Sequence, residues 1–183
     1  GALRAFTMPD CEVATAYFAW STRQAEEIAD VLGKAEDAKK FRQLHQNVVA
    51  AYRKEFLPDG MVHSKRQCRY VRPVALDLVD EETKERVVSR LNQMVAENQY
   101  RIGTGFLSTP HICRVLTEHG YTQSAYGLLE NETAPGWLYE VNKGATTIWE
   151  NWFGKNERNV PTNSMNHYSP GAVVGWMYSH VAG

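Results

Sequence analysis

The chain has 183 residues, with 20 Lys and Arg against 21 Asp and Glu, a formal charge of −1, and 43% apolar residues. This composition is typical of a globular protein and argues against a strongly basic nucleic-acid binder or a charge-driven membrane-surface binder. No apolar run approaches the roughly 20 residues that a membrane-spanning helix needs. The length suits one domain, or one large part of a bigger domain.

The first residues, GALR, do not begin a secretory signal, and the chain lacks an initiating Met. We therefore expect a processed or excised piece, for which no compartment is inferred. Its three cysteines are widely spaced and form no C-x-x-C motif: Cys11, Cys68 and Cys113. This pattern predicts three buried free thiols and no disulfide framework.

The first two predicted helices form a long hairpin. A cap-like segment at residues 7–10 (TMPD) opens a helix that ends at Gly33, and a second helix runs to about Phe56, before the turn at 58–60. Apolar residues recur at helical spacing in both. In the first they are Val13, Tyr17, Trp20, Ile28 and Val31, and in the second Ala38, Phe41, Leu44, Val48, Tyr52 and Phe56.

The middle of the chain reads as short helices separated by loops. Residues 61–69 predict an irregular loop, the basic stretch 64–73 a solvated loop and helix start, and residues 74–79 a short apolar helix. Asp80 caps the next helix, and Gly103 to Gly105 form a break. Thr109 and Thr122 then start two further helices. The expected buried residues are Val87, Val88, Leu91, Met94, Val95, Ile112, Val115, Leu116, Ala125, Leu128 and Leu129.

In the last third, residues 132–143 predict a loop, a helical stretch begins near Thr146, and a polar loop over 154–166 precedes a last helix. That helix holds Val173, Val174, Met177 and Val181. No segment alternates with the period of a strand for long enough. We therefore predict an all-α chain of antiparallel hairpins, either an α-solenoid or a closed toroid, and the long polar loops favour the toroid.

Several familiar catalytic motifs are absent. The chain has no phosphate-binding G-x-x-x-x-G-K-[ST] motif and no G-x-S-x-G nucleophile elbow. His111 and His119 are eight residues apart, and no histidine pair has metal-ligand spacing. We expect neither a metal nor a cofactor.

The C-terminal third is instead rich in aromatic and polar side chains. Such a mixture is typical of carbohydrate clefts, where rings stack on sugar faces and polar groups bind hydroxyls, or of a helical core plugged by large rings, as we expect for Trp176. Glu150 is expected near a helix start, whose dipole favours the ionised state that a general base needs. The residues in question are Trp137, Tyr139, Glu140, Asn142, Trp149, Glu150, Asn151, Trp152, Phe153, Asn166, His167 and Tyr168.

Three ordered segments resemble the signatures of bacterial α-L-rhamnosidases, glycoside hydrolase family 78. They are GTGFLSTP at 103–110, GATTIWE at 144–150 and SMNHY at 164–168. Residues 9–10 (PD), 13–19 (VATAYFA) and 32–33 (LG) also look like that family, so the resemblance covers nearly the whole chain.

The resemblance implies an (α/α)6 barrel and the hydrolysis of terminal α-L-rhamnosyl groups with inversion. It places the general base on Glu150 and a sugar contact on His167, and we expect Trp137, Trp149 and Trp152 to contact substrate. The expected partner is therefore a rhamnosyl glycoside, with no nucleic acid, no membrane and no cofactor. The family's general acid lies in an acidic block that precedes these motifs and matches nothing here.

A complete ring of twelve helices also needs roughly twice this length. Residues 1–183 are therefore expected to be one partial domain, the C-terminal half of an (α/α)6 toroid, which has the base but lacks the acid. Alone, such a piece should be inactive and should self-associate through exposed inner helix faces. Two alternatives stay open: another (α/α)6 glycosidase or polysaccharide lyase, and a non-catalytic helical-repeat interaction domain in which the aromatic residues of 132–168 are buried.

Overall fold

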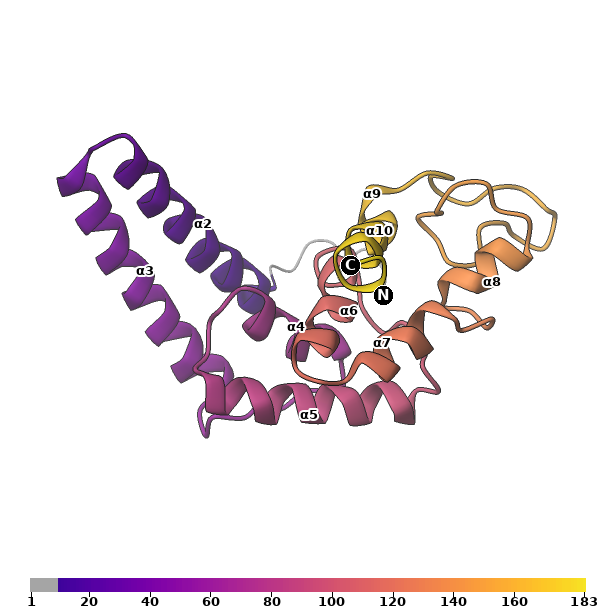
Figure 1. Ribbon diagram of the computed structural model, residues 1–183, viewed down its shortest axis with the longest axis horizontal. Coiled ribbons are helices and arrows are strands. Elements are labelled where there is room, and N and C mark those ends of the chain that lie inside the picture. The colour runs from indigo at the N-terminus through magenta and orange to yellow at the C-terminus, as the bar shows by residue number, and fades with distance from the viewer. Residues whose placement is uncertain (1–9) are drawn as a thin grey trace. The chain divides into compact units, whose positions relative to one another are not determined.

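The computed structural model describes residues 10–183, and their regular secondary structure is entirely helical (Figure 1). Between residues 10 and 183 no strand forms, and the one isolated β-bridge joins Lys155 to Pro161. The predicted cap-like residues 7–9, including Pro9 of the family resemblance, lie outside the described residues. The chain divides into two compact units, the first made of residues up to His63 with Leu76–Lys84, the second of Ser64–Ala75 with Glu85–Gly183.

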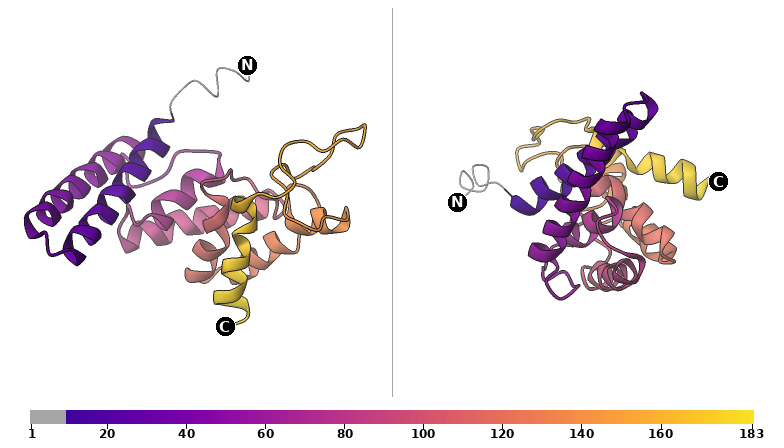
Figure 2. Two further views of the ribbon diagram at one scale, coloured as in Figure 1. Left: turned by 90° about the horizontal axis from the view of Figure 1, so that it is seen from above. Right: turned by 90° about the vertical axis from the view of Figure 1, so that its left-hand side faces the viewer.

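The first unit is built on the predicted hairpin of α2 (Cys11–Val31) and α3 (Ala35–Phe56), which run side by side in Figures 1 and 2. A buried polar contact joins the two helices, because the Tyr52 hydroxyl donates a hydrogen bond of 2.7 Å to Glu12 Oε1. Both side chains are almost fully buried. A hydrogen bond of this kind satisfies polar groups that would otherwise destabilise the core.

The predicted apolar face of α2 is wrong from the middle of the helix onward, since Trp20 is 42% exposed. Ile28 and Val31 are 59% and 87% exposed, as is the following Leu32 at 64%. The face that packs on α3 instead uses small side chains, which let the two backbones approach closely: Ala16, Ala19 and Ala29.

The second unit holds the remaining helices, with α5 from Glu85 onward. The Asp80 carboxylate caps α5 by accepting the Thr83 N–H at 2.9 Å, as predicted. The predicted apolar residues of α5 and α6 are buried. The elements are α4 (Gln67–Ala75), α5 (Glu81–Glu97), α6 (Thr109–Glu118), α7 (Thr122–Leu129), α8 (Trp137–Asn142), α9 (Tyr168–Gly171), α10 (Val173–Trp176) and the π-helical turn η1 (Met177–Val181).

The prediction of a solvated loop and helix start over residues 64–73 is wrong for most of that stretch, where helix α4 forms. The helix begins at Gln67 and ends before the predicted apolar stretch 74–79 is complete. Tyr70, Val71 and Val74 bury one face, and Arg72 is buried with its Nη1 donating to Ser108 Oγ at 3.2 Å. Because burial of this arginine is supported by distant partners, local charge patterning could not reveal it.

The region around Thr146 also differs from expectation. The predicted loop 132–143 contains α8, whereas no helix begins near Thr146. Gly144 has a φ of +80°, a conformation that glycine adopts without a steric penalty, and it directs the chain away from the helix axis. Backbone groups of 148 and 150 then bond to residues more than ten positions away rather than to the next helical turn.

The predicted burial of the Trp176 ring is confirmed, whereas the predicted burial of all three cysteine thiols is confirmed only in part. Trp176 is buried, and its Nε1 donates to Thr117 Oγ1 at 3.0 Å. Of the three thiols, Cys113 is buried, Cys68 is half-buried and Cys11 is exposed. Within residues 10–183, no helix combines the length and apolar character that a membrane crossing requires.

The exposed face of α2 generates a prediction. Ile28, Val31 and Leu32 lie at i, i+3 and i+4, so they form one apolar patch that water contacts unfavourably. We expect the 183-residue chain to self-associate in a concentration-dependent way, measured by sedimentation equilibrium. The double substitution Ile28→Lys and Val31→Lys should shift the chain toward monomer, whereas Glu36→Lys, at an exposed position of α3, should not. Equal association of all three proteins would contradict the role of this patch.

Candidate functional site

Glu150 lies in an irregular segment and not at a helix start. The expected dipole contribution is therefore absent, because α8 ends at Asn142 and α9 begins only at Tyr168. Hydrogen bonds take its place: Glu150 Oε2 accepts the Ser164 N–H at 3.0 Å, and Oε1 accepts Asn163 Nδ2 at 3.2 Å. The half-buried carboxylate is thus held in one orientation.

His167 is the residue that caps α9. Its Nδ1 accepts the Ser169 N–H at 3.2 Å, so the ring proton of the neutral form is assigned to Nε2. The imidazole is stacked between Phe106, with centroids 4.4 Å apart, and Tyr168, with centroids 5.0 Å apart. The ring is half-buried, and its plane and tautomer are both fixed by neighbours.

The structure brings the three signature segments together. The Glu150 N–H donates to Ser164 O and the His167 N–H donates to Ile148 O, both at 2.9 Å, so segments 144–150 and 164–168 run alongside one another. In Figure 1 these loops, orange to yellow, run beside α8 and into α9. Segment 103–110 joins them through the stacking of Phe106 on His167. Segment 103–110 is part of the family resemblance, but the sequence did not reveal that Phe106 stacks on His167, because only the fold brings the two rings together.

Two of the three tryptophans predicted to contact sugar are buried in this structure. Trp137 and Trp149 are 3% and 5% exposed, so neither has a free ring face. Trp137 Nε1 donates to Pro170 O at 2.9 Å, and its ring meets Trp152 edge to face with centroids 5.5 Å apart. Trp152 is half-buried.

Glu140 is the carboxylate nearest in sequence to Glu150, and it is fully buried in α8. Its Oε2 accepts the Trp149 N–H at 2.9 Å, while Oε1 has no hydrogen-bond partner among the described residues. Burial raises the pKa of this carboxyl to about 7, against the smaller lowering effect of the Trp149 hydrogen bond. From the sequence, Glu140 stood out only as one of the polar side chains of the aromatic-rich C-terminal third.

Glycine at 154 allows Trp149 to pack. A Cβ at this position would lie 2.1 Å from the Trp149 ring, and the residue has a φ of +67°. Close approach and a left-handed backbone therefore both require glycine here.

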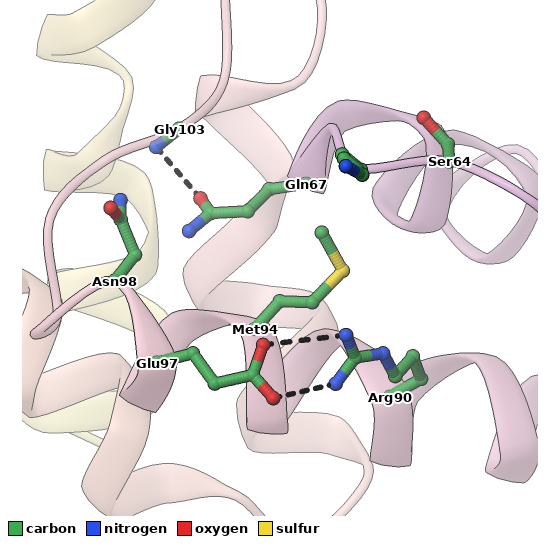
Figure 3. A pocket seen from close by; sticks show the side chains of 8 residues that line it. Ser64, Gln67, Arg90, Met94, Glu97, Asn98 and Gly103 are labelled. Atoms are coloured by element: carbon green, nitrogen blue, oxygen red, sulfur yellow. Dashed lines mark hydrogen bonds and ion pairs between the residues drawn. The ribbon is translucent and has the colours of Figure 1, made fainter.

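Two cavities border the Gly103 turn. One, of about 580 Å³, lies between α4, α5 and the segment 98–103, where Gln67 Oε1 accepts the Gly103 N–H at 2.7 Å and Arg90 pairs with Glu97 (Figure 3). The other, of about 530 Å³, is lined by Phe106 and the buried Arg72. Within residues 10–183, no group of three or more His, Cys, Asp or Glu side chains is arranged to hold a metal ion.

Buried Glu140 predicts a pH-dependent stability. Its pKa is near 4.5 in the unfolded chain and about 7 in the folded protein, so the folded state binds the proton more tightly and stability falls as pH rises from 4.5 to 7. Relative to the wild type, Glu140→Gln should gain about 3 kcal/mol of unfolding free energy across this window. Urea denaturation at a series of pH values measures the difference, with exposed Glu132→Gln as control. Parallel pH profiles for wild type and Glu140→Gln would contradict the raised pKa.

Comparison with known proteins places this geometry in a family. The model of the bacterial alpha-L-rhamnosidase 6 hairpin glycosidase domain matches residues 5–181. An alpha-L-rhamnosidase of Formosa agariphila is 40% identical over 177 residues, which are 93% of this chain and 19% of that protein.

Solved structures agree. The crystal structure of Streptomyces avermitilis alpha-L-rhamnosidase complexed with L-rhamnose has 34% identity and a TM-score of 0.87, covering 96% of this chain and 17% of that one. Native α-L-rhamnosidase from Aspergillus terreus has 28% identity and a TM-score of 0.86, covering 94% and 21%. The chain spans about a fifth of the length of these relatives. The predicted family and the predicted fold, part of an α/α toroid, are thus confirmed, and the chain belongs to the six-hairpin glycosidase domain family of bacterial α-L-rhamnosidases.

Proposed function

We propose that the chain is the base-bearing part of an enzyme that removes terminal α-L-rhamnose from glycosides or polysaccharides with inversion at the anomeric carbon. Membership of the rhamnosidase family supports this reaction over a polysaccharide lyase or a helical-repeat interaction domain. The observation that carries the assignment is the direct hydrogen bonding between the segments of Glu150 and His167. These bonds place the segments of the two residues side by side, which supports a shared site.

Glu150 is proposed as the general base. A carboxylate has about four acceptor positions, and Asn163 and Ser164 occupy two of them, which leaves room for a water molecule. Glu150 accepts one proton from this water while the water oxygen forms a bond to the anomeric carbon. The bond to the leaving oxygen breaks on the opposite face of the sugar.

The leaving oxygen needs a proton from a second carboxyl, roughly 6.5–9.5 Å from the base in an inverting enzyme. Glu140 does not suit this role, since its side chain is fully buried and hydrogen bonds to the backbone of Trp149. We propose that the acid lies outside residues 1–183, on the part of the toroid that precedes them.

His167 is proposed to bind the sugar and not to transfer protons. With Nδ1 engaged by Ser169, the Nε2 proton is available to donate to a sugar hydroxyl. Stacking on Phe106 restricts rotation of the ring. Trp152 is proposed to contact the substrate from the same group of loops.

Replacing Glu150 tests the base. In the full-length protein, Glu150→Gln should fold and bind rhamnose but lower kcat by roughly 10²- to 10⁴-fold, because the amide cannot accept the proton of water. Steady-state kinetics with an aryl α-L-rhamnoside measures this loss. Glu157→Gln, in the exposed polar loop, is the control. Near-normal turnover by Glu150→Gln would remove this residue from the mechanism.

Replacing His167 separates binding from chemistry. His167→Ala should raise KM by about tenfold while kcat falls less, since a hydrogen bond made to both bound substrate and transition state is lost. Thermal melting checks that α9 survives the loss of its cap, and His63→Ala, at an exposed position, is the matched control. A loss confined to kcat, with a new pH dependence, would show instead that His167 transfers a proton.

The isolated 183-residue chain is expected to be catalytically silent. Without acid catalysis the leaving group departs as an alkoxide, which costs roughly 10²- to 10⁴-fold in rate. Incubation of the purified chain with an aryl α-L-rhamnoside should release no phenol above background. Release above background would place a proton donor within this sequence, and Glu140 would be the first residue to substitute.

A further inference from the structure

The carboxyl of Glu140 occupies an energetically unfavourable environment. It is 0% exposed, and only one of its two oxygens has a hydrogen-bond partner among the described residues. A buried carboxyl with an unsatisfied oxygen destabilises a fold relative to an apolar side chain of similar size. The bond that it does make, to the Trp149 N–H, is therefore the feature to explain.

That bond serves a segment without regular structure. Trp149 is buried, and the backbone at Ile148, Trp149 and Glu150 is neither helix nor strand. The Trp149 N–H therefore lacks the acceptor that a helical turn or a sheet would supply. A buried N–H without an acceptor is rare in proteins because it is costly. Glu140 Oε2 supplies the acceptor from the neighbouring helix α8, at 2.9 Å.

We infer that Glu140 is a positioning residue for the proposed base, because its carboxyl anchors the backbone N–H of Trp149, the residue that immediately precedes Glu150. This inference rests on the proposed function of Glu150. The Trp149 side chain is packed against Gly154, so both the backbone and the ring of this residue are fixed. Next to this anchored residue, the Glu150 N–H donates to Ser164 O, and the Glu150 carboxylate accepts the Ser164 N–H.

The anchor needs an acceptor oxygen and not a negative charge. A neutral carboxyl keeps a carbonyl oxygen that accepts an N–H, and the apolar surroundings of Glu140 favour that neutral form. Glutamine has the same shape and offers the same oxygen. Leucine has a similar volume and offers none. These two substitutions therefore separate the hydrogen bond from the packing.

The test uses the full-length protein and an aryl α-L-rhamnoside. Glu140→Gln should keep kcat and KM within about threefold of wild type. Glu140→Leu should lower kcat by about 10- to 100-fold with KM changed less than threefold, since small misplacements of a catalytic group cost rates of this size. Glu132→Leu, at an exposed position before α8, is the matched control and should leave both constants unchanged.

Amide hydrogen exchange gives a second readout that does not depend on catalysis. In Glu140→Leu the exchange rate of the Trp149 amide should rise at least tenfold, whereas Glu140→Gln should leave it near the wild-type rate. Unchanged kcat and unchanged exchange in Glu140→Leu would overturn the inference. A loss in Glu140→Gln as large as in Glu140→Leu would also overturn it, because the charge or proton of the carboxyl would then be essential.

Two further measurements keep the result interpretable. If Glu140→Leu does not fold, Glu140→Asp takes its place. Its side chain is one methylene shorter, which draws the carboxyl away from the Trp149 N–H, and losses in the same direction are expected. Glu150→Gln is measured in parallel. Full turnover by Glu150→Gln would reject the proposed base, whereas Trp149 exchange would still report whether Glu140 anchors the segment.

Discussion

The candidate site depends on the hydrogen-bonded pairing of two irregular segments. The Glu150 N–H donates to Ser164 O, the Ser164 N–H donates to the Glu150 carboxylate, and the His167 N–H donates to Ile148 O. Since neither segment is a helix or a strand, no regular ladder would hold Glu150 and His167 if these bonds were lost. A change that displaces one segment is therefore expected to displace the other segment and the side chain of Glu150 or His167 that it carries.

Short helices on either side stabilise this pairing. From α8, the buried Glu140 carboxyl accepts the Trp149 N–H, and Trp137 donates to Pro170 O in α9. His167 itself caps α9 through Ser169, so one side chain serves both the helix start and the proposed sugar contact. Long helices could not follow the sharp changes of direction that these loops make. The irregular backbone thus requires buried acceptors, which explains why polar groups occur where the core would otherwise be apolar.

Sequence periodicity correctly predicted helices whose buried face is set by their own apolar pattern. Helix α5 has an N-cap at Asp80 and a complete apolar face, and both were found as expected. Periodicity failed at α4, where distant partners bury Arg72, and near Thr146, where the backbone bonds to segment 164–168 and not to its own next turn. The family resemblance pointed to Glu150 and His167 as the proposed base and sugar contact, but it did not give the geometry of either residue. It could not reveal the anchor at Glu140, because the N–H that needs an acceptor becomes apparent only in the fold.

Aromatic composition alone could not separate a sugar-binding ring from a core ring, because both roles use the same apolar face. Trp137 and Trp149 are buried, as a non-catalytic helical domain would also predict, whereas membership of the rhamnosidase family supports the proposed catalytic role. The buried pair nevertheless supports the proposed chemistry. An inverting mechanism needs a base held at a fixed distance across the sugar from its acid. A base on an irregular loop keeps such a distance more readily if the loop is anchored from within. The buried rings and the Glu140 carboxyl, which bonds to the Trp149 N–H, therefore support the proposed role of Glu150.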